Sequence, residues 1–406
     1  MQTRIKKLKT KKKDETLSTE PKYFTTNKEL LETLGLLLSP KNGVSFRSIF
    51  SLTLITSGVF HYSLRVVMDL KELELLSVIK IFHLTCIYLT SSLSAWMVLL
   101  NSKHFYVLHS IIRGGFYTYP DGLTNEQALI RSRANLKVFK ISKYGPWFFV
   151  IGTLGSVLKE PLPYDFEEWY KEYAGWIPFV VNSWPRYVAS QLYHLMAAMS
   201  AALLGGSICI VFITIAEHLL AQLEILCIEV DRVINLIPRN GDVKSEMVVS
   251  SRIRRCIQHH HVILGYFMTF QLYFNIPLFF FLAATSIAMC TMAFLVTDPH
   301  STFGMSVAFL SLFAPEIVFC FCYCTYGQKI ADMGEKLKAT ICRAPWYMQS
   351  VPAQKALKMI LMRSQRPLML SASGFKDCSF ASFGEIIQTT YTYFNMLQVM
   401  RKKGNF

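Results

Sequence analysis

The sequence predicts an all-α membrane protein, a seven-transmembrane helical bundle. Of its 406 residues, 52% are hydrophobic and only 17% are charged, whereas a soluble protein would carry about 25% charged residues. The 30 phenylalanines and a mean hydropathy of +0.32 also favour a polytopic membrane protein over several soluble domains. The first residues are polar and basic, so no cleavable signal peptide is expected and insertion depends on the first internal span.

Four apolar segments are expected to cross the membrane in the first half of the chain. The first follows residues 1–44, a predicted cytosolic arm, and its charged residues can snorkel or face the bundle. The third is short, carries Pro146, and follows the polar and basic residues 101–143. The fourth contains Gly205 and Gly206, which allow close helix contact or mark a bend. These four spans are expected at 45–68, 75–100, 144–158 and 187–215.

Three further spans and two cytosolic helical segments are expected in the second half. Residues 216–261 keep a helical apolar period with interleaved charges, which predicts that the fourth helix continues into the cytosol. The fifth span is too long for one upright crossing, and a tilted helix bent at Pro277 accounts for its length. Residues 328–370 form the second cytosolic helical segment, and 401–406 form a short tail. These three spans are expected at 262–296, 304–326 and 380–400.

The distribution of Lys and Arg predicts a cytosolic N-terminus and an extracellular C-terminus. The segments 1–44, 101–143, 216–261 and 328–370 together hold 31 Lys and Arg residues, and the segments on the other side of the membrane hold 7. The side with more Lys and Arg is expected to face the cytosol. Arg401, Lys402 and Lys403 would then lie outside, against the local rule. The net charge of +15 is concentrated partly in the N-terminal arm, where it is expected to contact anionic lipid of the bilayer and no nucleic acid.

The last span carries a polar stripe along one side of its helix. At 100° per residue its Glu, Gln and Thr residues fall together, and large apolar residues fall opposite. Two interpretations remain open. The helix is buried in a bundle with its hydroxyls bonded to neighbours, or it lines a pore that an apolar constriction gates by dewetting. The predicted pore and gate residues are Glu385, Gln388, Thr389, Thr392, Met396 and Val399.

Several short motifs lie close together near the C-terminus. They are Tyr326-Gly327 after an apolar helix, Trp346, the turn Arg363-Ser364-Gln365-Arg366-Pro367, Phe375, and the ending Thr390-Tyr391-Thr392-Tyr393-Phe394. In these residues the chain resembles the insect odorant receptor family. The match is dense over this last part of the chain, while elsewhere only the hydropathy layout agrees.

The resemblance implies an odorant receptor subunit that binds a small volatile, hydrophobic molecule and gates a non-selective cation channel. It implies a tetramer in which four last helices surround the conduit, formed with a common co-receptor subunit. The chain resembles the ligand-tuned partner, because the co-receptor has a much longer segment between spans four and five. A plasma-membrane location in a sensory neuron dendrite is also implied. We expect no enzyme, cofactor or metal site, because no nucleophile–base or metal-ligand constellation recurs.

The resemblance also implies a ligand pocket in the outer half of the bundle, between spans two, three, four and six. Volatile ligands offer few polar atoms, so an apolar and aromatic cage with one or two polar groups is expected. Any single candidate is more often ordinary bundle packing than a ligand contact. The candidates by depth are Tyr88, Phe148, Phe149, Gly152, Ser156, Met196, Met199, Phe309 and Phe313.

Three alternatives were weighed against this interpretation. A gustatory receptor-like channel usually ends in Thr-Tyr, five apolar residues and Gln-Phe, whereas here four residues separate Thr392-Tyr393 from Gln398-Val399. A G-protein-coupled receptor predicts an outside N-terminus and an Asp-Arg-Tyr-like triplet after span three, which this sequence lacks. A transporter predicts paired ionisable groups in inverted repeats, but Glu316, the best internal carboxylate, has no counterpart in a second half.

Overall fold

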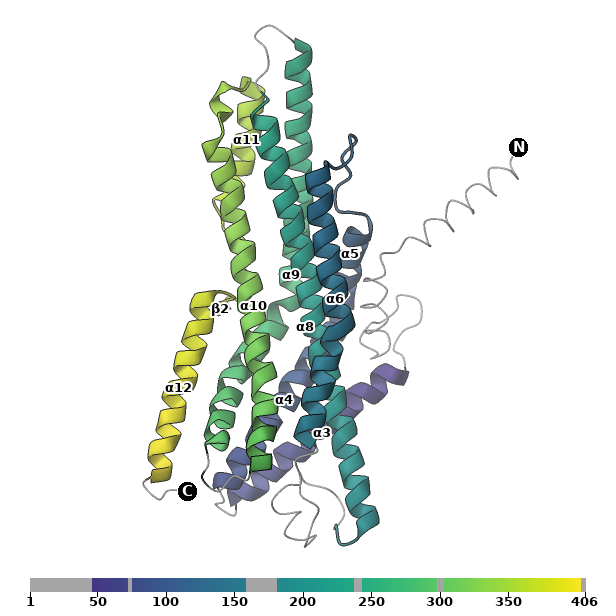
Figure 1. The fold of residues 1–406 in the computed structure, drawn as a ribbon, viewed down its shortest axis with the longest axis vertical. Coiled ribbons are helices and arrows are strands. Elements are labelled where there is room, and N and C mark those ends of the chain that lie inside the picture. Colours follow the sequence, from purple (N-terminus) through teal and green to yellow (C-terminus); the bar gives the residue numbers. More distant parts are fainter. Residues whose placement is uncertain are drawn as a thin grey trace, which may run out of the picture.

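The computed structural model of the protein describes residues 46–71, 75–157, 181–236, 243–297, 299 and 303–402. Over these residues the chain is a bundle of long helices with one small hairpin (Figure 1). The predicted arm, 1–44, and most of the predicted tail, 401–406, lie outside them. The elements are α3 (Phe46–Lys71), α4 (Leu75–Leu100), α5 (Ser102–Arg113), α6 (Asn125–Val157), α8 (Trp184–Ile234), α9 (Val243–Val296), α10 (Phe303–Arg343), η1 (Trp346–Met348), α11 (Val351–Ser364), β1 (Ser371–Ala372), β2 (Lys376–Asp377) and α12 (Phe380–Lys402).

The predicted all-α seven-helix class is confirmed. Helices α3, α4, α6, α8, α9, α10 and α12 each overlap one predicted span, in chain order; residues 45 and 158, at the edges of the first and third spans, lie outside the described residues. Four of the described helices are apolar enough to cross a membrane by composition alone, within Ile81–Leu100, Trp184–Ile234, Ser245–Val296 and Phe309–Arg343. The remaining three carry more polar side chains. The shortest of them, α12, has 23 residues and reaches about 35 Å at ~1.5 Å per residue, enough for a hydrocarbon core of about 30 Å.

Several helices continue well beyond their predicted spans. Helix α6 begins at Asn125 although its predicted span begins at 144, and α8 continues to Ile234. Helix α9 is one 54-residue helix that contains Pro277, and α10 continues to Arg343. The charged segments beyond the predicted spans are rich in residues of high helix propensity, so the helices continue past the expected membrane boundary.

Helix α8 lies at the centre of the bundle, in contact with α3, α4, α6, α9 and α10. From Leu204 to Ile234 most of its side chains are buried on every side. Phe212 packs there between aromatic rings of α9 and α10, with centroids 5.1 Å from Phe270 and 4.6 Å from Tyr323. Helices that are apolar all round belong in the interior of a bundle, and α8 takes that position.

A buried carboxylate on α8 ties three helices together. Glu217 is only 8% exposed and accepts a 2.5 Å hydrogen bond from the hydroxyl of Tyr326 on α10. The ammonium of Lys137 on α6 forms an ion pair with the same carboxylate. A buried charge is costly unless it is paired and hydrogen-bonded, so this contact fixes α6, α8 and α10 relative to one another.

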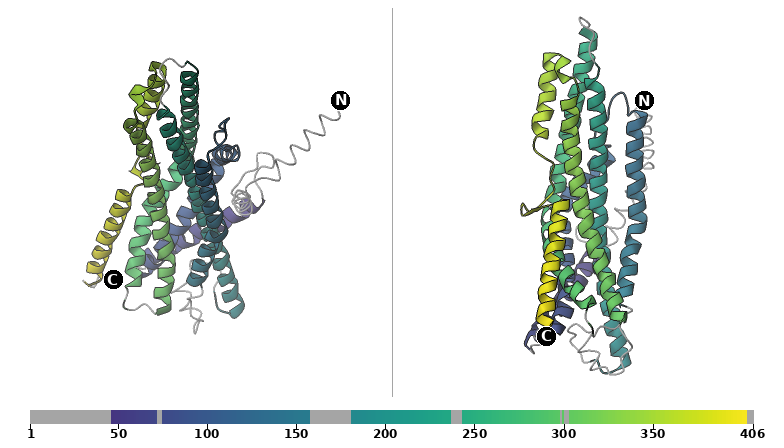
Figure 2. Two further views of the ribbon diagram at one scale, coloured as in Figure 1. Left: turned by 45° about the horizontal axis from the view of Figure 1, so that its top comes forward. Right: turned by 60° about the vertical axis from the view of Figure 1, so that its left-hand side comes forward.

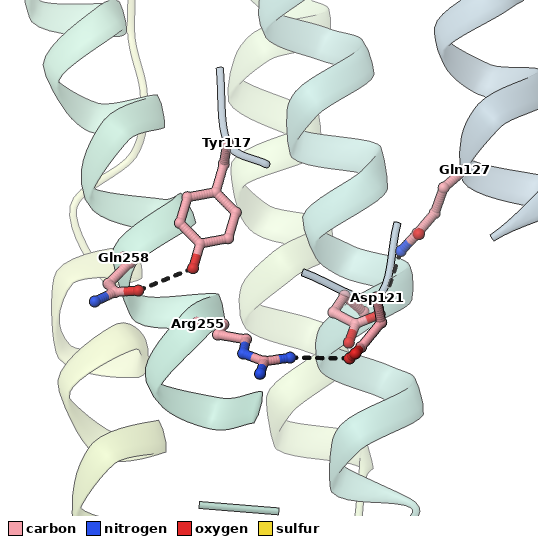
Figure 3. A network of polar contacts seen from close by, with 6 residues as sticks. Tyr117, Asp121, Gln127, Arg255 and Gln258 are labelled. Carbon is pink, nitrogen blue, oxygen red and sulfur yellow. Dashed lines mark hydrogen bonds and ion pairs between the residues drawn. The ribbon is translucent and has the colours of Figure 1, made fainter. Parts of the chain in front are cut away.

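The turn between α5 and α6 is held against α9 by polar contacts (Figure 3). The Tyr117 hydroxyl donates to Gln258 Oε1 at 2.9 Å, and Arg255 Nη1 lies 2.9 Å from Asp121 Oδ2. Tyr119 is buried beneath them, 2.8 Å from Nδ1 of His259. Burial raises the pKa of Tyr119, so its hydroxyl stays neutral and can share this bond.

The hairpin of β1 and β2 precedes α12 and is fastened to α9. Gln271 accepts the Ser371 N–H at 3.0 Å, and Asn275 accepts the Ser373 N–H at 2.7 Å. On its other side the hairpin meets α10 at Gly327, where an added Cβ would lie 2.1 Å from the carbonyl oxygen of Cys378. Figures 1 and 2 show that α12 then leaves along the edge of the bundle, beside α9 and α10.

Gly327→Ala is expected to destabilise the protein. A methyl group at this site overlaps backbone atoms of Cys378, so α10 and the hairpin must separate, which costs about 1–3 kcal/mol. The apparent melting temperature of the protein in detergent micelles measures the effect. Gly265→Ala on α9 is the matched control, because a Cβ at Gly265 meets nothing within 4 Å. Equal melting temperatures for the two variants would contradict the close approach at Gly327.

Candidate functional site

A partly open cavity lies in the bundle, between α4, α6, α8 and α10. Its volume is about 150 Å³, and Tyr62 of α3 completes its wall. A second cavity of about 50 Å³ continues from it toward α9 and shares five lining residues with it. We call the two the main cavity and the side cavity. The shared residues are Ile87, Ser91, Gly205, Glu316 and Phe319.

Aromatic rings form much of the main cavity's wall. Tyr62 and Tyr88 stack with centroids 5.1 Å apart, and Phe149 stacks on Phe319 at 4.8 Å. These two stacked pairs come from α3 with α4 and from α6 with α10, so the rings also bind the helices to one another. Large rings held by stacking give a rigid wall suited to an organic ligand of few polar atoms.

The cavity exists because α8 presents small residues to it. Ala198, Ala201, Ala202 and Gly205 repeat at helical spacing along the face of α8 that lines the cavity. Gly206, the next residue, lets the ring of Phe149 lie against the helix, since a Cβ there would be 2.3 Å from Phe149 Cδ2. Small side chains on one helix and large rings on its neighbours therefore leave an unfilled volume between them.

Polar side chains enter this wall at a few positions. Gln191 and His194 lie one turn apart on α8, while Ser91 and Thr153 come from α4 and α6. Glu316 on α10 is the single carboxylate among the lining residues, which include no Lys or Arg. It accepts a hydrogen bond of 3.3 Å from the hydroxyl of Thr285 on α9. The arrangement can hold an organic molecule and bond its polar head.

Three of the nine predicted ligand contacts line the main cavity: Tyr88, Phe149 and Gly152. Phe148 and Met196 are exposed on the outside of the bundle, 45% and 48% respectively. The side chain of Ser156 lies outside the described residues.

The other three predicted contacts lie away from both cavities. Met199 is half-buried on α8, and Phe313 is half-buried against the main core. Phe309 is buried in a separate apolar cluster with Ile79 and Phe294, with its ring 5.5 Å from that of His83.

The polar lining residues are not among the ligand contacts predicted from the sequence. Gln191 and His194 are three residues apart and lie on the face of α8 that continues into Ala198. Glu316 follows Pro315 in the middle of an apolar segment. A search of each apolar span for polar residues that share a face with small ones would have found these three.

All six predicted pore residues lie on the exposed face of α12. A different face packs on the bundle through Ser382, Ile386 and Thr390, which are buried. Among the described residues, the predicted pore residues therefore point away from the other helices. Glu385 forms an ion pair of 3.0 Å with Lys376 of the hairpin. The six exposed residues are Glu385, Gln388, Thr389, Thr392, Met396 and Val399.

Comparison with known proteins gives one consistent result. The family model described as 7tm Odorant receptor matches residues 74–391, more than half of the chain. Odorant receptor 85c of Drosophila melanogaster is 26% identical over 148 residues, which are 36% of this chain and 38% of that receptor. Odorant receptor 13a of the same species is 22% identical over 262 residues, 61% of this chain and 59% of that receptor. The chain thus spans less than two thirds of the length of these relatives.

Solved structures resemble the fold over almost the whole chain. The insect olfactory receptor OR5 from Machilis hrabei in complex with eugenol superposes with a TM-score of 0.76 at 15% identity, covering 93% of this chain and 98% of that one. The same receptor in a second structure gives a TM-score of 0.70, also at 15% identity, and covers 92% and 96%. At this identity the likeness concerns the fold alone.

Gly206→Ala is expected to disturb the cavity wall and Gly205→Ala to leave it in place. A methyl group at Gly206 overlaps the Phe149 ring, whereas one at Gly205 meets nothing within 4 Å. Overpacking at Gly206 should cost about 1–3 kcal/mol, while alanine at Gly205 gains up to about 1 kcal/mol of helix propensity. Melting temperatures of the two variants, measured against the parent protein, test this. A stable Gly206→Ala protein would show that Phe149 does not lie against α8.

Proposed function

This chain belongs to the odorant receptor family of seven-helix membrane proteins, which are receptors and not enzymes. On that premise we propose that it is the ligand-tuned subunit of an odorant-gated cation channel. The observation that carries the proposal is the main cavity, a small, partly open chamber in the bundle whose wall is rich in aromatic rings. Its volume of about 150 Å³ resembles that of engineered cavities that bind benzene, so it suits a volatile molecule.

The conducting path in this proposal is lined by α12. One helix with one polar stripe cannot enclose a pore, so several copies must meet around an axis. We propose a tetramer with a common co-receptor subunit, each subunit turning the exposed face of α12 inward. Glu385 and the neighbouring hydroxyls would then face the ion path, and Met396 and Val399 would form its apolar constriction. Lys376 beside Glu385 partly offsets the carboxylate's charge, which fits weak rather than strict cation selectivity.

Helix α10 can connect the cavity to α12. Leu312 and Glu316 of α10 line the main cavity, and Phe309 lies one to two turns away on the same helix. Phe309 belongs to an apolar cluster against which Phe394 and Leu397 of α12 pack. At the end of α12, Gln398 donates a hydrogen bond of 2.7 Å to Thr297 beyond α9. A ligand that favours a shifted α10 would thereby act on the half of α12 that holds the constriction.

Such a ligand must bind the open conformation more tightly than the closed one. The largest shift in free energy between the two conformations equals the difference between the ligand's binding free energies for them, whatever its overall affinity.

We place the receptor in the plasma membrane, by analogy in a sensory neuron dendrite, with the N-terminus in the cytosol and the end of α12 outside. The excess of Lys and Arg on one set of connections supports this orientation.

Whole-cell recording tests the function. The chain is expressed alone and with an insect co-receptor, under a panel of volatile esters, terpenes, aldehydes and amines. A fast cation current that needs the co-receptor and does not need GTP is expected. A response that requires GTP turnover, or an equal current from this chain alone, would contradict the proposal of a ligand-tuned partner subunit. Surface labelling in each case controls for delivery to the membrane.

Met396→Ala and Val399→Ala are expected to raise the current without ligand, together more than singly. Shortening either side chain widens the apolar constriction and makes it easier to wet. The measurement is the basal current divided by the maximal ligand-evoked current in the co-expressed channel. Met362→Ala is a matched control, because Met362 is an exposed methionine on α11, away from α12. Basal and evoked currents equal to those of the parent channel would show that these two residues do not form the gate.

A further inference from the structure

Glu316 occupies an unusual position for an ionisable side chain. It lies on α10 within an apolar membrane span and borders both the main cavity and the side cavity. Its hydrogen-bond partner is the neutral hydroxyl of Thr285, at 3.3 Å. Among the described residues, no Lys, Arg or His lies within ion-pair distance of its carboxylate.

A carboxylate at this depth is expensive to hold. Ionisable groups inside a membrane protein are usually paired or border a polar site, because an isolated charge is poorly stabilised there. One hydroxyl does not offset the loss of hydration, since a hydrogen bond to a charged group contributes only about 1.5–3 kcal/mol net. The Glu217 carboxylate on α8 shows the contrast, because it is paired with Lys137 and bonded to Tyr326.

The walls around Glu316 favour a cation. Phe319 lies one turn from Glu316 on α10, borders both cavities and stacks on Phe149. Tyr62 and Tyr88 line the other side of the main cavity. Ammonium groups bind to the faces of such rings, and the attraction is larger where water is excluded. A carboxylate among aromatic faces is therefore the chemistry of an ammonium site.

We propose that the ligand of this receptor is a small amine, bound as its ammonium ion with the nitrogen on Glu316 and the hydrocarbon part among the rings. This inference rests on the proposed function, because it names the ligand class of the same cavity. A main cavity of about 150 Å³ suits a hydrocarbon part of roughly the size of a benzene ring. Gln191, His194, Ser91 and Thr153 offer hydrogen bonds to further polar atoms.

Pairs of amines and alcohols of the same shape test the inference. Benzylamine with benzyl alcohol, and hexylamine with hexan-1-ol, differ in charge and hardly in size. Binding to the purified full-length protein in lipid nanodiscs is measured by calorimetry at neutral pH. Each amine is expected to bind at least about tenfold more tightly than its alcohol. Equal or weaker binding of the amines, or binding of neither member, would overturn the inference.

Two substitutions assign the preference to its residue. Glu316→Gln keeps the shape of the side chain and removes its charge, so the tenfold preference for amines should disappear while alcohol binding persists. Glu335→Gln is the matched control on the same helix, because Glu335 is exposed and pairs with Lys338 far from the cavity. If Glu316→Gln retains the preference, Glu316 does not bind the amine. The preference of the parent protein remains decisive even if Glu316→Gln does not fold.

The two proposals fail in different ways. If alcohols open the co-expressed channel and amines show no preference, the channel function stands and the amine site is wrong. If amines bind as expected and no ligand evokes current with the co-receptor, the site stands and the channel function is wrong.

Discussion

The bundle depends on the buried carboxylate of Glu217. Its bonds to Lys137 and Tyr326 join α6, α8 and α10, the helices that carry three walls of the main cavity. Removing either partner would leave the buried carboxylate with only one of its two stabilising contacts, so the bundle should lose stability. Next to Tyr326, Gly327 admits the hairpin that begins the path to α12. Two adjacent residues therefore set both the packing of the cavity helices and the position of the last helix.

This arrangement constrains two parts of α10 differently. The middle of the helix is fixed by Tyr326 and lies against the hairpin at Gly327, while its N-terminal half borders the cavity at Leu312 and Glu316. Between them the ring of Phe319 stacks on Phe149 of α6. The N-terminal half of α10 also contributes Phe309 to the apolar cluster against which Phe394 and Leu397 of α12 pack, and Phe321 places its ring on Phe383 of α12. In the proposed mechanism the bond between Tyr326 and Glu217 holds the middle of α10 in place, so a bound ligand moves the N-terminal half of that helix.

Much of the fold could be predicted from hydropathy and period, but the orientation of each helix could not. The polar stripe of α12 follows from spacing alone, and the structure leaves that face exposed. Phe148 and Phe149 are equally deep in the sequence, yet only Phe149 lines the cavity, because the rotation of α6 is decided by Gly206 on another helix. The hairpin also escaped prediction, since its partners Gln271 and Asn275 lie about a hundred residues earlier.

The fold's tolerance of sequence change follows from the same contacts. A chain with 15% identity keeps a TM-score of 0.76, because most positions along α8 need only an apolar side chain of suitable volume. Gly206 and Gly327 have no such freedom, since a single methyl group at either overlaps a neighbour. The cavity is the opposite case. A side chain that borders the cavity without packing between helices faces empty volume on one side, so its replacement disturbs fewer contacts. Ligand preference can therefore diverge in this bundle while its architecture stays the same.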